Sequence, residues 1–407
     1  MFYKFPIIEH VDQVREAIKG RTEFIVAERE WGFVANYLVN LIDSFPYPDT
    51  KDEKLNEMYK IRRECRGIKF DLNGLPLARP FHKFHNLGER PETAADRVDF
   101  SRSFITLDKL DGSMIHPIII DDKVMLCTKM GLTDVATPVQ VYAERGLSFV
   151  NDKKAKTWYV DFMYDLAKSG MTPIFEWCSR QQRIVIDYGD KDHLVLTAVR
   201  ETISGKYKSY DQMVALAEAY KIPVVDHWEG TFEGIQEFVE KVQEKEGEEG
   251  CIIRFDNGHM LKIKNPWYLQ LHKTKELLQF EKDVWALVLD EKQDDAKAFM
   301  EQEDKDRIDA FADDLYGALD AIAERLKWEV IAWVDNHGDS QKKFAVEFIN
   351  GKDSVFDHHE KTLLYKIKLD IDNARTFVHD YVRNNVSTST KVESIRGFVN
   401  DINWEDY

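Results

Sequence analysis

The hydrophobic pattern changes character near Glu281, and this change limits the fold more than any other feature of the chain. Residues 1 to about 280 alternate strand-like apolar runs with shorter helical ones, which predicts an α+β domain with a mostly antiparallel sheet. Residues 281–407 keep a helical periodicity nearly throughout, which predicts an all-helical C-terminal domain. We therefore expect two domains, 1–280 and 281–407, with an N-terminal subdomain up to about residue 100 in the first.

The expected elements follow from the spacing of the apolar residues. Strands are expected at residues 68–72, 104–107, 114–120, 123–129, 174–177, 183–188, 194–200, 251–255 and 260–263, and helices at 211–220 and 232–245. In the C-terminal part, one apolar stripe follows a long helix through Ile308, Phe311, Leu315, Leu319, Ile322, Leu326, Val330 and Trp333. Such a stripe belongs to a core more often than to a groove for a partner. Further helical runs are expected at about 358–383 and 391–402.

The composition is that of a globular protein in water, with 407 residues of which 43% are hydrophobic and 32% charged. No apolar run reaches the roughly eighteen residues that a membrane-spanning helix requires. Residues 1–6 lack the long apolar core of a signal peptide. We expect a cytoplasmic protein without a membrane partner, and the sequence indicates no obligate protein partner.

The cysteines Cys65, Cys127, Cys178 and Cys251 lie far apart and form no Cys-x-x-Cys pair. This spacing indicates neither a zinc ribbon nor a dense disulfide framework. We expect reduced, buried thiols that serve as small apolar side chains.

The formal net charge of −17 argues at first sight against a nucleic-acid partner, because phosphate contacts need Lys and Arg. The acidic excess is concentrated in residues 281–407, which carry 17 Lys and Arg against 29 Asp and Glu. The first 280 residues are closer to balance, with 39 against 44. A local basic cleft is therefore compatible with the overall charge.

The pentapeptide Lys109-Leu110-Asp111-Gly112-Ser113 lies between two expected strands, so Lys109 should stand at a strand end in a tight turn. A lysine amine is a nucleophile only when desolvation or neighbouring cations lower its pKa. This arrangement is the one that a covalent nucleotidyltransferase needs. Taken alone, it fits a solvated hairpin turn better, and the other motifs must decide between the two interpretations.

The upstream motifs supply cations. Arg66 beside Gly67 could bring a guanidinium and bare backbone close to a phosphate or a ribose, and Lys83 adds a second cation. A surface turn is the alternative. His82 and His85 are spaced as a metal pair, but no third ligand has suitable spacing, so we do not expect a metal there.

The downstream motifs supply one acid within an expected strand and one acid just before another. Glu176 lies in an otherwise apolar run, where a carboxylate is costly without a partner. It could accept hydrogen bonds from ribose hydroxyls, or form a buried pair with Arg180 or Arg183. Glu249, which precedes a glycine, could hold Mg²⁺ directly or through water.

Lys262 and Lys264 form a Lys-x-Lys pattern on an expected strand. Both ammonium groups then point to the same face, where together they could hold a polyphosphate and lower the pKa of a third lysine. In most proteins this pattern only keeps an edge strand soluble.

In this order and spacing, the motifs resemble the RNA ligases of the bacteriophage T4 RNA ligase 1 type. That family belongs to the covalent nucleotidyltransferase superfamily, which includes DNA ligases and capping enzymes. The likeness covers most of the first 275 residues. It runs through Glu64–Gly67, Arg79-Pro80, Lys83-Phe84, Lys109 to Ser113, Phe175-Glu176, Ile184-Val185, Glu249-Gly250, Lys262 to Lys264, Trp267-Tyr268 and Leu271-His272.

The resemblance implies an ATP-dependent ligase that joins 5′-phosphate and 3′-hydroxyl ends of single-stranded RNA through lysyl-AMP and RNA-adenylate intermediates. It implies Lys109 as the nucleophile, Mg²⁺ as the metal with Mn²⁺ as a substitute, and nicked tRNA ends as a substrate in RNA repair. It also implies a phage-encoded enzyme in the host cytoplasm. By position, Glu176 would hold the ribose and Glu249 would help to organise the metal. The remaining nucleotide-binding residues would be Arg66, Lys83, Gly112, Lys129, Lys262 and Lys264.

The chain departs from the family pattern at Leu110, where an acid is usual, and at His85, where a phenylalanine is expected. An imidazole at position 85 could alter the stacking of an RNA end, because it is smaller and can be charged. In the acidic tail, which this family associates with substrate choice, Asp290, Asp294 and Asp295 are spaced for a structural cation. A capped helix start is the alternative for these aspartates.

Two other classes of protein stay open. The first is another covalent nucleotidyltransferase, such as a DNA ligase or a capping-type enzyme. The helices expected after Lys264, in place of an oligonucleotide-binding barrel, argue against it. The second is a non-catalytic RNA-binding protein with a degenerate site, and the intact lysines argue against that.

Overall fold

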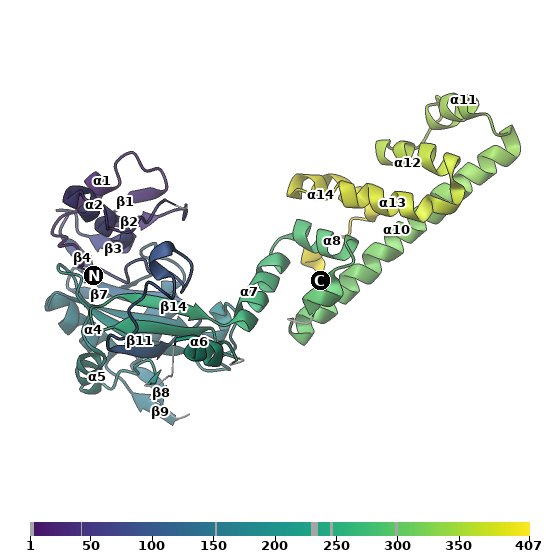
Figure 1. Cartoon of the computed structure of the whole chain (residues 1–407). Helices are drawn as coiled ribbons and strands as arrows, with labels where there is room; N and C mark the ends of the chain where they lie inside the picture. Colours follow the sequence, from purple (N-terminus) through teal and green to yellow (C-terminus); the bar gives the residue numbers. More distant parts are fainter. Residues whose placement is uncertain (1–3, 42, 151–152, 229–234, 245–246, 298–299) are drawn as a thin grey trace. The chain divides into compact units, whose positions relative to one another are not determined.

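The computed structural model describes residues 4–41, 43–150, 153–228, 235–244, 247–297 and 300–407 (Figure 1). The chain divides into two compact units, Met1–Leu269 and Gln270–Tyr407. The domain boundary expected near Glu281 lies within the second of these units.

The first unit begins with a four-stranded antiparallel sheet in the order β1-β2-β3-β4. Its strands are β1 (Phe24–Arg29), β2 (Gly32–Tyr37), β3 (Arg66–Phe70) and β4 (Pro76–Ala78). Helices α1 (Val11–Ala17) and α2 (Glu53–Glu64) pack on each other and on an apolar core that includes Phe45, Ile68 and Phe70 (Figure 1). Helix α2 ends at Glu64 and β3 begins at Arg66. The packing of this helix on the four-stranded sheet therefore fixes the position of Arg66.

Two further antiparallel sheets form the body of the first unit. One has the order β11-β10-β6-β7, from His193–Glu201, Met171–Cys178, Ser113–Ile120 and Lys123–Cys127. The other has the order β12-β5-β13-β14, from His227–Trp228, Phe104–Asp108, Gly250–Phe255 and Met260–Lys264. The residues between β5 and β6 therefore pass from one sheet to the other, and this crossing is the Lys109 turn.

Helices cover these sheets and complete the core. The apolar faces of α3 (Ala136–Arg145), α4 (Tyr159–Lys168) and α5 (Tyr210–Glu218) pack into a cluster with Phe175, Trp177 and Leu196. Helix α6 (Ile235–Gln243) packs against β13 and β14. A hairpin of β8 (Leu147–Val150) and β9 (Lys153–Lys156) follows α3.

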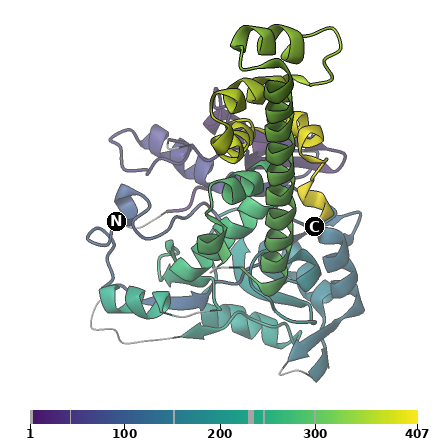
Figure 2. The same ribbon diagram turned by 90° about the vertical axis from the view of Figure 1, so that its right-hand side faces the viewer.

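The second unit consists of helices around one apolar core. After α7 (Pro266–Leu278), which spans the division between the units, come α8 (Glu281–Leu289), α9 (Gln293–Lys297), α10 (Gln302–His337), α11 (Gln341–Lys343), α12 (His358–Leu369), α13 (Ala374–Asn384) and α14 (Ser389–Arg396). Figure 2 shows α10 as the longest helix, and both α12 and α13 pack against it. The expected stripe from Ile308 to Trp333 is buried along this helix, so its assignment to the core is confirmed.

The predicted fold class is confirmed: an α+β part with antiparallel sheets precedes a helical C-terminal part. All four cysteines are buried and free, as expected. None of the helices in the described ranges is both long and apolar enough to span a membrane.

Two element predictions are wrong. Residues 183–188 form no strand, because the N–H groups of Val185 and Ile186 donate to the Asp111 carboxylate at 2.7 Å instead of to a neighbouring strand. The helix expected at 358–383 is divided between α12 and α13, because Asp370 is extended and accepts a hydrogen bond from Asn373. Of the helix expected at 232–245, the part outside α6 includes residues that the structure does not describe.

Several elements of the first unit are absent from the sequence-based list, among them the helices α1, α2, α3 and α4 and the strands β1, β2, β4, β8, β9 and β12. Strands β1 and β2 are only partly buried at several positions, so their apolar alternation is weak.

Candidate active site

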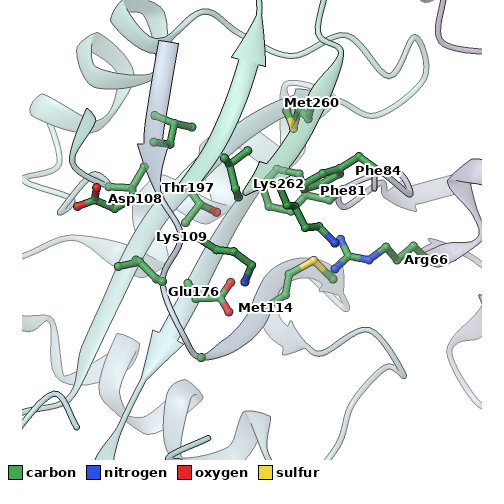
Figure 3. A pocket seen from close by; sticks show the side chains of 15 residues that line it. Arg66, Phe81, Phe84, Asp108, Lys109, Met114, Glu176, Thr197, Met260 and Lys262 are labelled. Atoms are coloured by element: carbon green, nitrogen blue, oxygen red, sulfur yellow. The ribbon is translucent and has the colours of Figure 1, made fainter. Parts of the chain in front are cut away.

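Lys109 directly follows β5, and its backbone N–H donates to the carbonyl of Gly250 at 3.1 Å. This hydrogen bond ties the start of the turn to the start of β13. The side chain lines a cavity of about 210 Å³ and forms an ion pair through Nζ with Oε2 of Glu249. Figure 3 shows Lys109 and Glu176 pointing toward each other across this cavity. The expected strand-end lysine therefore stands at a cavity, not in a solvated hairpin turn.

The inner wall of the cavity is apolar. Its side chains come from the loop before β5 and from strands of both central sheets: Phe81, Phe84, Leu107, Met114, Ile252 and Met260. An enclosed apolar wall with aromatic rings suits a flat nucleobase better than a fully hydrated ligand.

Two cations face Lys109 on the other side of the cavity, where Figure 3 shows Arg66 and Lys262 close together. The Lys262 ammonium lies 4.8 Å from the centre of the Phe84 ring. Burial lowers the pKa of Lys262 well below its ordinary value, and the neighbouring cations Arg66 and Lys109 lower it further. Nη1 of Arg66 is buried without a hydrogen-bond partner. Arg66 and Lys262 are thus neighbouring cations, and the free N–H donor of Arg66 could bind an oxygen of a polyanionic ligand.

Glu249 is buried, with 3% of its surface exposed, and lies between two lysines. One carboxylate oxygen pairs with Lys109, and the other lies 3.2 Å from Nζ of Lys264. Because Lys264 is opposite Gly250 in the β13–β14 register, the position of this lysine follows from the sheet. The expected set of Lys109, Glu249 and Lys264 is thus brought together.

Glu176 lies in β10 and lines the cavity, half-buried. Burial raises its pKa to about 7, Lys109 opposes this rise, and Glu249 adds to it. Arg180 pairs with Asp187 and Asp190, and Arg183 with Asp187. The Glu176 carboxylate thus lines the cavity, and its contact with a ribose stays a prediction.

Lys83 and Lys129 lie beside the cavity, and both contact Tyr37, a residue that the sequence analysis did not single out. The ring of Tyr37, at the end of β2, lies 4.2 Å from Nζ of Lys129 and 5.3 Å from that of Lys83. Burial raises the Tyr37 pKa, but Lys83, Lys129 and Arg66 together lower it below its ordinary value. An aromatic residue at the end of an apolar run was the only signal in the sequence.

Packing against β3 positions Lys129. Gly67 has φ of +95°, and a Cβ there would lie 2.6 Å from the Lys129 carbonyl oxygen. Nζ of the buried Lys69 donates to the Thr128 carbonyl at 2.7 Å. The close approach of the Lys129 backbone therefore requires a glycine at position 67, and a contact of this glycine with a phosphate or a ribose stays a prediction.

Gly112 has a similar structural requirement. A Cβ at this position would lie 2.3 Å from the Trp177 carbonyl oxygen and 3.2 Å from Cγ of Glu176. The glycine lines the cavity and lets the Lys109 turn lie directly against β10.

Asp111 organises the turn, a role that the sequence analysis did not assign. Its carboxylate accepts hydrogen bonds from the N–H groups of Val185 and Ile186 and from the Tyr268 hydroxyl, each at 2.7 Å. Its own N–H donates to the Tyr188 hydroxyl. The turn is thereby joined to residues 185–188 and to the start of α7.

His82 and His85 have separate partners. His82 Nδ1 contacts the Tyr207 hydroxyl at 2.9 Å, and His85 Nδ1 contacts Glu89 at 3.0 Å. Burial lowers the pKa of His85 to about 4, although Glu89 opposes this shift. The imidazole is 1% exposed and neutral near pH 7, which corrects the expectation of a stacking group that can be charged.

The described residues contain no group of three His, Cys, Asp or Glu side chains suited to a metal. Asp294 pairs with Lys297, and Asp290 with Arg383 and Lys292. The side chain of Asp295 lies outside the described ones. A cation at these aspartates stays a prediction.

Comparison with known proteins gives the family. A family model described as RNA ligase matches residues 64–268. A protein of Thermovibrio ammonificans named "Putative RNA ligase" is 34% identical over 306 residues, which cover 72% of this chain and 74% of the relative. The chain belongs to the RNA ligase family.

Solved structures of ligases are also similar. An archaeal ATP-dependent RNA ligase is 12% identical, with a TM-score of 0.41 over 69% of this chain and 65% of that chain. The Naegleria gruberi RNA ligase with pyrophosphate is 16% identical, with a TM-score of 0.34 over 42% of this chain and 52% of that chain. The chain thus matches about half the length of the Naegleria ligase.

Proposed function

We propose that this family member joins the ends of single-stranded RNA with ATP, through an AMP group carried on Lys109. One observation carries the proposal: the Lys109 amine lines a largely apolar cavity, opposite the partly buried cations Arg66 and Lys262 and beside the carboxylates of Glu249 and Glu176. A base in the cavity would bring the α-phosphate of ATP to the amine. The cations Arg66 and Lys262 would then face the phosphates.

In the first step, the unprotonated Lys109 amine attacks the α-phosphorus, and the bond to the β-phosphate oxygen breaks. Pyrophosphate leaves and a phosphoramidate forms. The amine must first lose a proton, and the carboxylate of Glu249 is its paired base. Lys264, on the other oxygen of Glu249, keeps that carboxylate in place.

In the second step, an oxygen of an RNA 5′-phosphate attacks the bound AMP and forms a phosphoanhydride, and the Lys109 amine leaves and takes up a proton. In the third step, a 3′-hydroxyl attacks the 5′-phosphate, loses its proton and displaces AMP. The cluster of Lys83, Lys129 and Tyr37 beside the cavity offers a place for the RNA 5′-phosphate. Nicked tRNA as the substrate, a role in RNA repair and a phage origin belong to the same proposal.

The residues present fit a divalent cation shared with the substrate. Mg²⁺ uses one or two carboxylates together with substrate phosphates, and here the carboxylates of Glu249 and Glu176 are close enough that Glu249 raises the pKa of Glu176. Glu249 would hold Mg²⁺ directly or through water, and Mn²⁺ would substitute. The ion would neutralise charge on the phosphates.

Covalent labelling tests the proposal. The protein is incubated with α-labelled ATP or GTP and Mg²⁺, run on a denaturing gel, and chased with 5′-phosphorylated RNA or DNA. We expect ATP label on the wild type, no label on Lys109→Ala, and transfer to RNA. Lys168→Ala, which removes an exposed lysine paired with Asp122, is the matched control and should label fully.

Each of the other outcomes contradicts part of the proposal. Labelling by GTP alone indicates a capping-type enzyme, and sealing of DNA alone indicates a DNA ligase. A wild-type protein that binds RNA but carries no label is a non-catalytic RNA-binding protein.

A further inference from the structure

A second cavity of about 620 Å³ lies elsewhere in the first unit. We call it the Arg254 cavity, and its walls come from the first residues of β5, the far end of β13 and the loop before α5. Lining residues include Phe104, Ile105, Tyr207, Lys208, Tyr210 and Arg254. None of its lining residues lines the Lys109 cavity.

The guanidinium of Arg254 is the unusual feature of this cavity. The residue is 5% exposed, and neither Nη1 nor Nη2 has a hydrogen-bond partner. Burial lowers its pKa to about 10, with Tyr207 and Tyr210 opposing, so the group stays charged near neutral pH. A buried cation without hydrogen bonds is costly. The other buried arginines differ, because Arg79 and Arg200 both pair with Glu64.

Asp256 also lines the Arg254 cavity, but it does not accept a hydrogen bond from the Arg254 guanidinium. Its carboxylate accepts from Arg102 at 2.7 Å. In the described part of the chain, no ion pair joins Arg254 to a carboxylate. The arginine is therefore a donor without an acceptor in the protein.

The sheet register explains why Arg254 points into a cavity. On β13, Arg254 is opposite Ile105 of β5 and Met260 of β14. Ile252, two residues earlier on the same face of β13, lines the Lys109 cavity. The two cavities thus share one face of the sheet.

The first turn of α5 adds a second feature that favours an anion. Ser209 is the N-cap of this helix, its Oγ accepts from the Gln212 N–H at 3.2 Å, and both residues line the Arg254 cavity. Backbone N–H groups and the positive end of the helix dipole meet there. Lys208, on the same wall, pairs with Glu201 at 3.0 Å.

We propose that the Arg254 cavity binds a phosphate group, with the Arg254 guanidinium as its principal ligand and the first turn of α5 beside it. The phosphate belongs either to a small molecule or to an RNA strand, and these two sources share the same chemistry. Only the RNA source rests on the proposed function. The aromatic rings of Tyr207 and Tyr210 would flank the group that carries the phosphate.

Calorimetry with inorganic phosphate tests the site. Because phosphate could also bind beside Lys109, the titrations use Lys262→Met as the background and compare it with Lys262→Met/Arg254→Met. Methionine keeps the length and apolar contacts of the arginine stem. We expect binding to the first protein and at least about tenfold weaker binding to the second, as for the loss of charge-assisted hydrogen bonds. Equal affinities, or no binding to either protein, would overturn the proposal.

A second measurement does not depend on the folding of the methionine variant. In the full-length wild type, the side-chain Nε–H signal of Arg254 is assigned by NMR through its loss in Arg254→Lys. We expect this signal to shift on addition of phosphate. A signal that stays in place while other arginine signals shift would contradict the site.

An RNA titration then identifies the source of the phosphate. The probe is a 5′-hydroxyl single-stranded RNA, which cannot be joined as a donor, and Arg145→Met serves as a control for an exposed arginine. RNA binding weakened by Arg254→Met but not by Arg145→Met supports an RNA phosphate. Unchanged RNA binding with lost phosphate binding supports a small molecule. Arg254→Met should still form lysyl-AMP at the full wild-type level. Lost phosphate binding with full labelling then concerns the Arg254 cavity alone, whereas absent labelling in the wild type concerns the proposed function.

Discussion

The Tyr268 hydroxyl donates to Oδ1 of Asp111 at 2.7 Å, within the buried part of the first unit. Residue 268 is at the start of α7, and residue 111 is in the turn that carries Lys109. The other oxygen of Asp111 holds Val185 and Ile186. One carboxylate therefore joins three segments that are far apart in the sequence and fixes the orientation of the turn.

Removal of the Tyr268 hydroxyl should loosen this turn. We expect Tyr268→Phe to lower the free energy of unfolding by about 1–2 kcal/mol, since it leaves a buried acceptor with one partner fewer. Lysyl-AMP formation should slow as well. The matched control is Tyr164→Phe, which removes an exposed hydrogen bond of equal length to Asp122. Urea unfolding measures the loss of stability, and the rate of lysyl-AMP labelling measures the loss of activity. If Tyr268→Phe and Tyr164→Phe lose the same stability and activity, Tyr268 has no positioning role.

Glu176 should make activity depend on pH near neutrality. Its raised pKa, about 7, means that the group is half protonated there, and the ionised form, which is the better acceptor for two ribose hydroxyls, gains population as the pH rises through 7. We expect the rate of lysyl-AMP formation to rise through about pH 7 in the wild type, and Glu176→Gln to be slow with a flatter profile in this range. A wild-type profile that is flat from pH 6 to 8 would contradict this assignment.

The same pKa has a consequence for stability. Because the folded state binds this proton more tightly than the unfolded state, the contribution of Glu176 to stability falls as the pH rises from about 4.5 to about 7. Glu176→Gln should therefore be more stable than the wild type at pH 8, by about 3 kcal/mol, and show little gain at pH 4. Thermal unfolding of both proteins at pH 8 and at pH 4 measures the gain in stability. A gain of the same size at both pH values would show that titration of Glu176 does not cause it.

Glu64 should give the opposite pH dependence. Its carboxylate pairs with Arg79 and Arg200 in a fully buried cluster; burial raises its pKa, but the two arginines lower it to about 2. The stabilisation is present above pH 4.5 and is lost as the pH falls toward 2. Glu64→Gln should cost about 3–5 kcal/mol at pH 7 and much less at pH 3. Thermal unfolding of the variant and the wild type at pH 7 and pH 3 measures this loss of stability. A loss that does not depend on pH would indicate that altered packing, and not the charge of Glu64, is its cause.

Gly112→Ala tests the contact between the Lys109 turn and β10. The added methyl group would lie 2.3 Å from the Trp177 carbonyl oxygen, so the turn must shift. We expect loss of stability and at least about tenfold slower lysyl-AMP formation, since small displacements of a nucleophile are costly. Gly317→Ala is the control, because nothing lies within 4 Å of that position in α10 and the change should stabilise the helix slightly. Full activity of Gly112→Ala would contradict the contact.

The sequence predicted the elements whose signal is local. The Ile308 to Trp333 stripe required only helical spacing, and β5 and β6 required only apolar runs on either side of the Lys109 turn. Residues 184–186 show the limit of this approach. Their apolar run fits a strand, but the acceptor for their N–H groups is a carboxylate distant in the chain.

The candidate site was predictable where charge and spacing coincide. Lys109, Glu249, Lys262 and Lys264 stand out as charged residues in or next to expected strands, and the structure brings them together. Tyr37 could not be predicted, because its contacts with Lys83 and Lys129 arise only from the packing of β2 in the folded protein. Arg254 has the same limitation: its lack of a partner is a property of the folded sheet.

The central claim is that Lys109 itself carries AMP. The full-length protein is incubated with ATP and Mg²⁺, digested at a pH that preserves phosphoramidates, and mapped by tandem mass spectrometry. We predict one AMP adduct, on the Lys109 side chain, which disappears when 5′-phosphorylated RNA is added. An adduct on another residue, or ligation of RNA without any adduct on Lys109, would contradict the account.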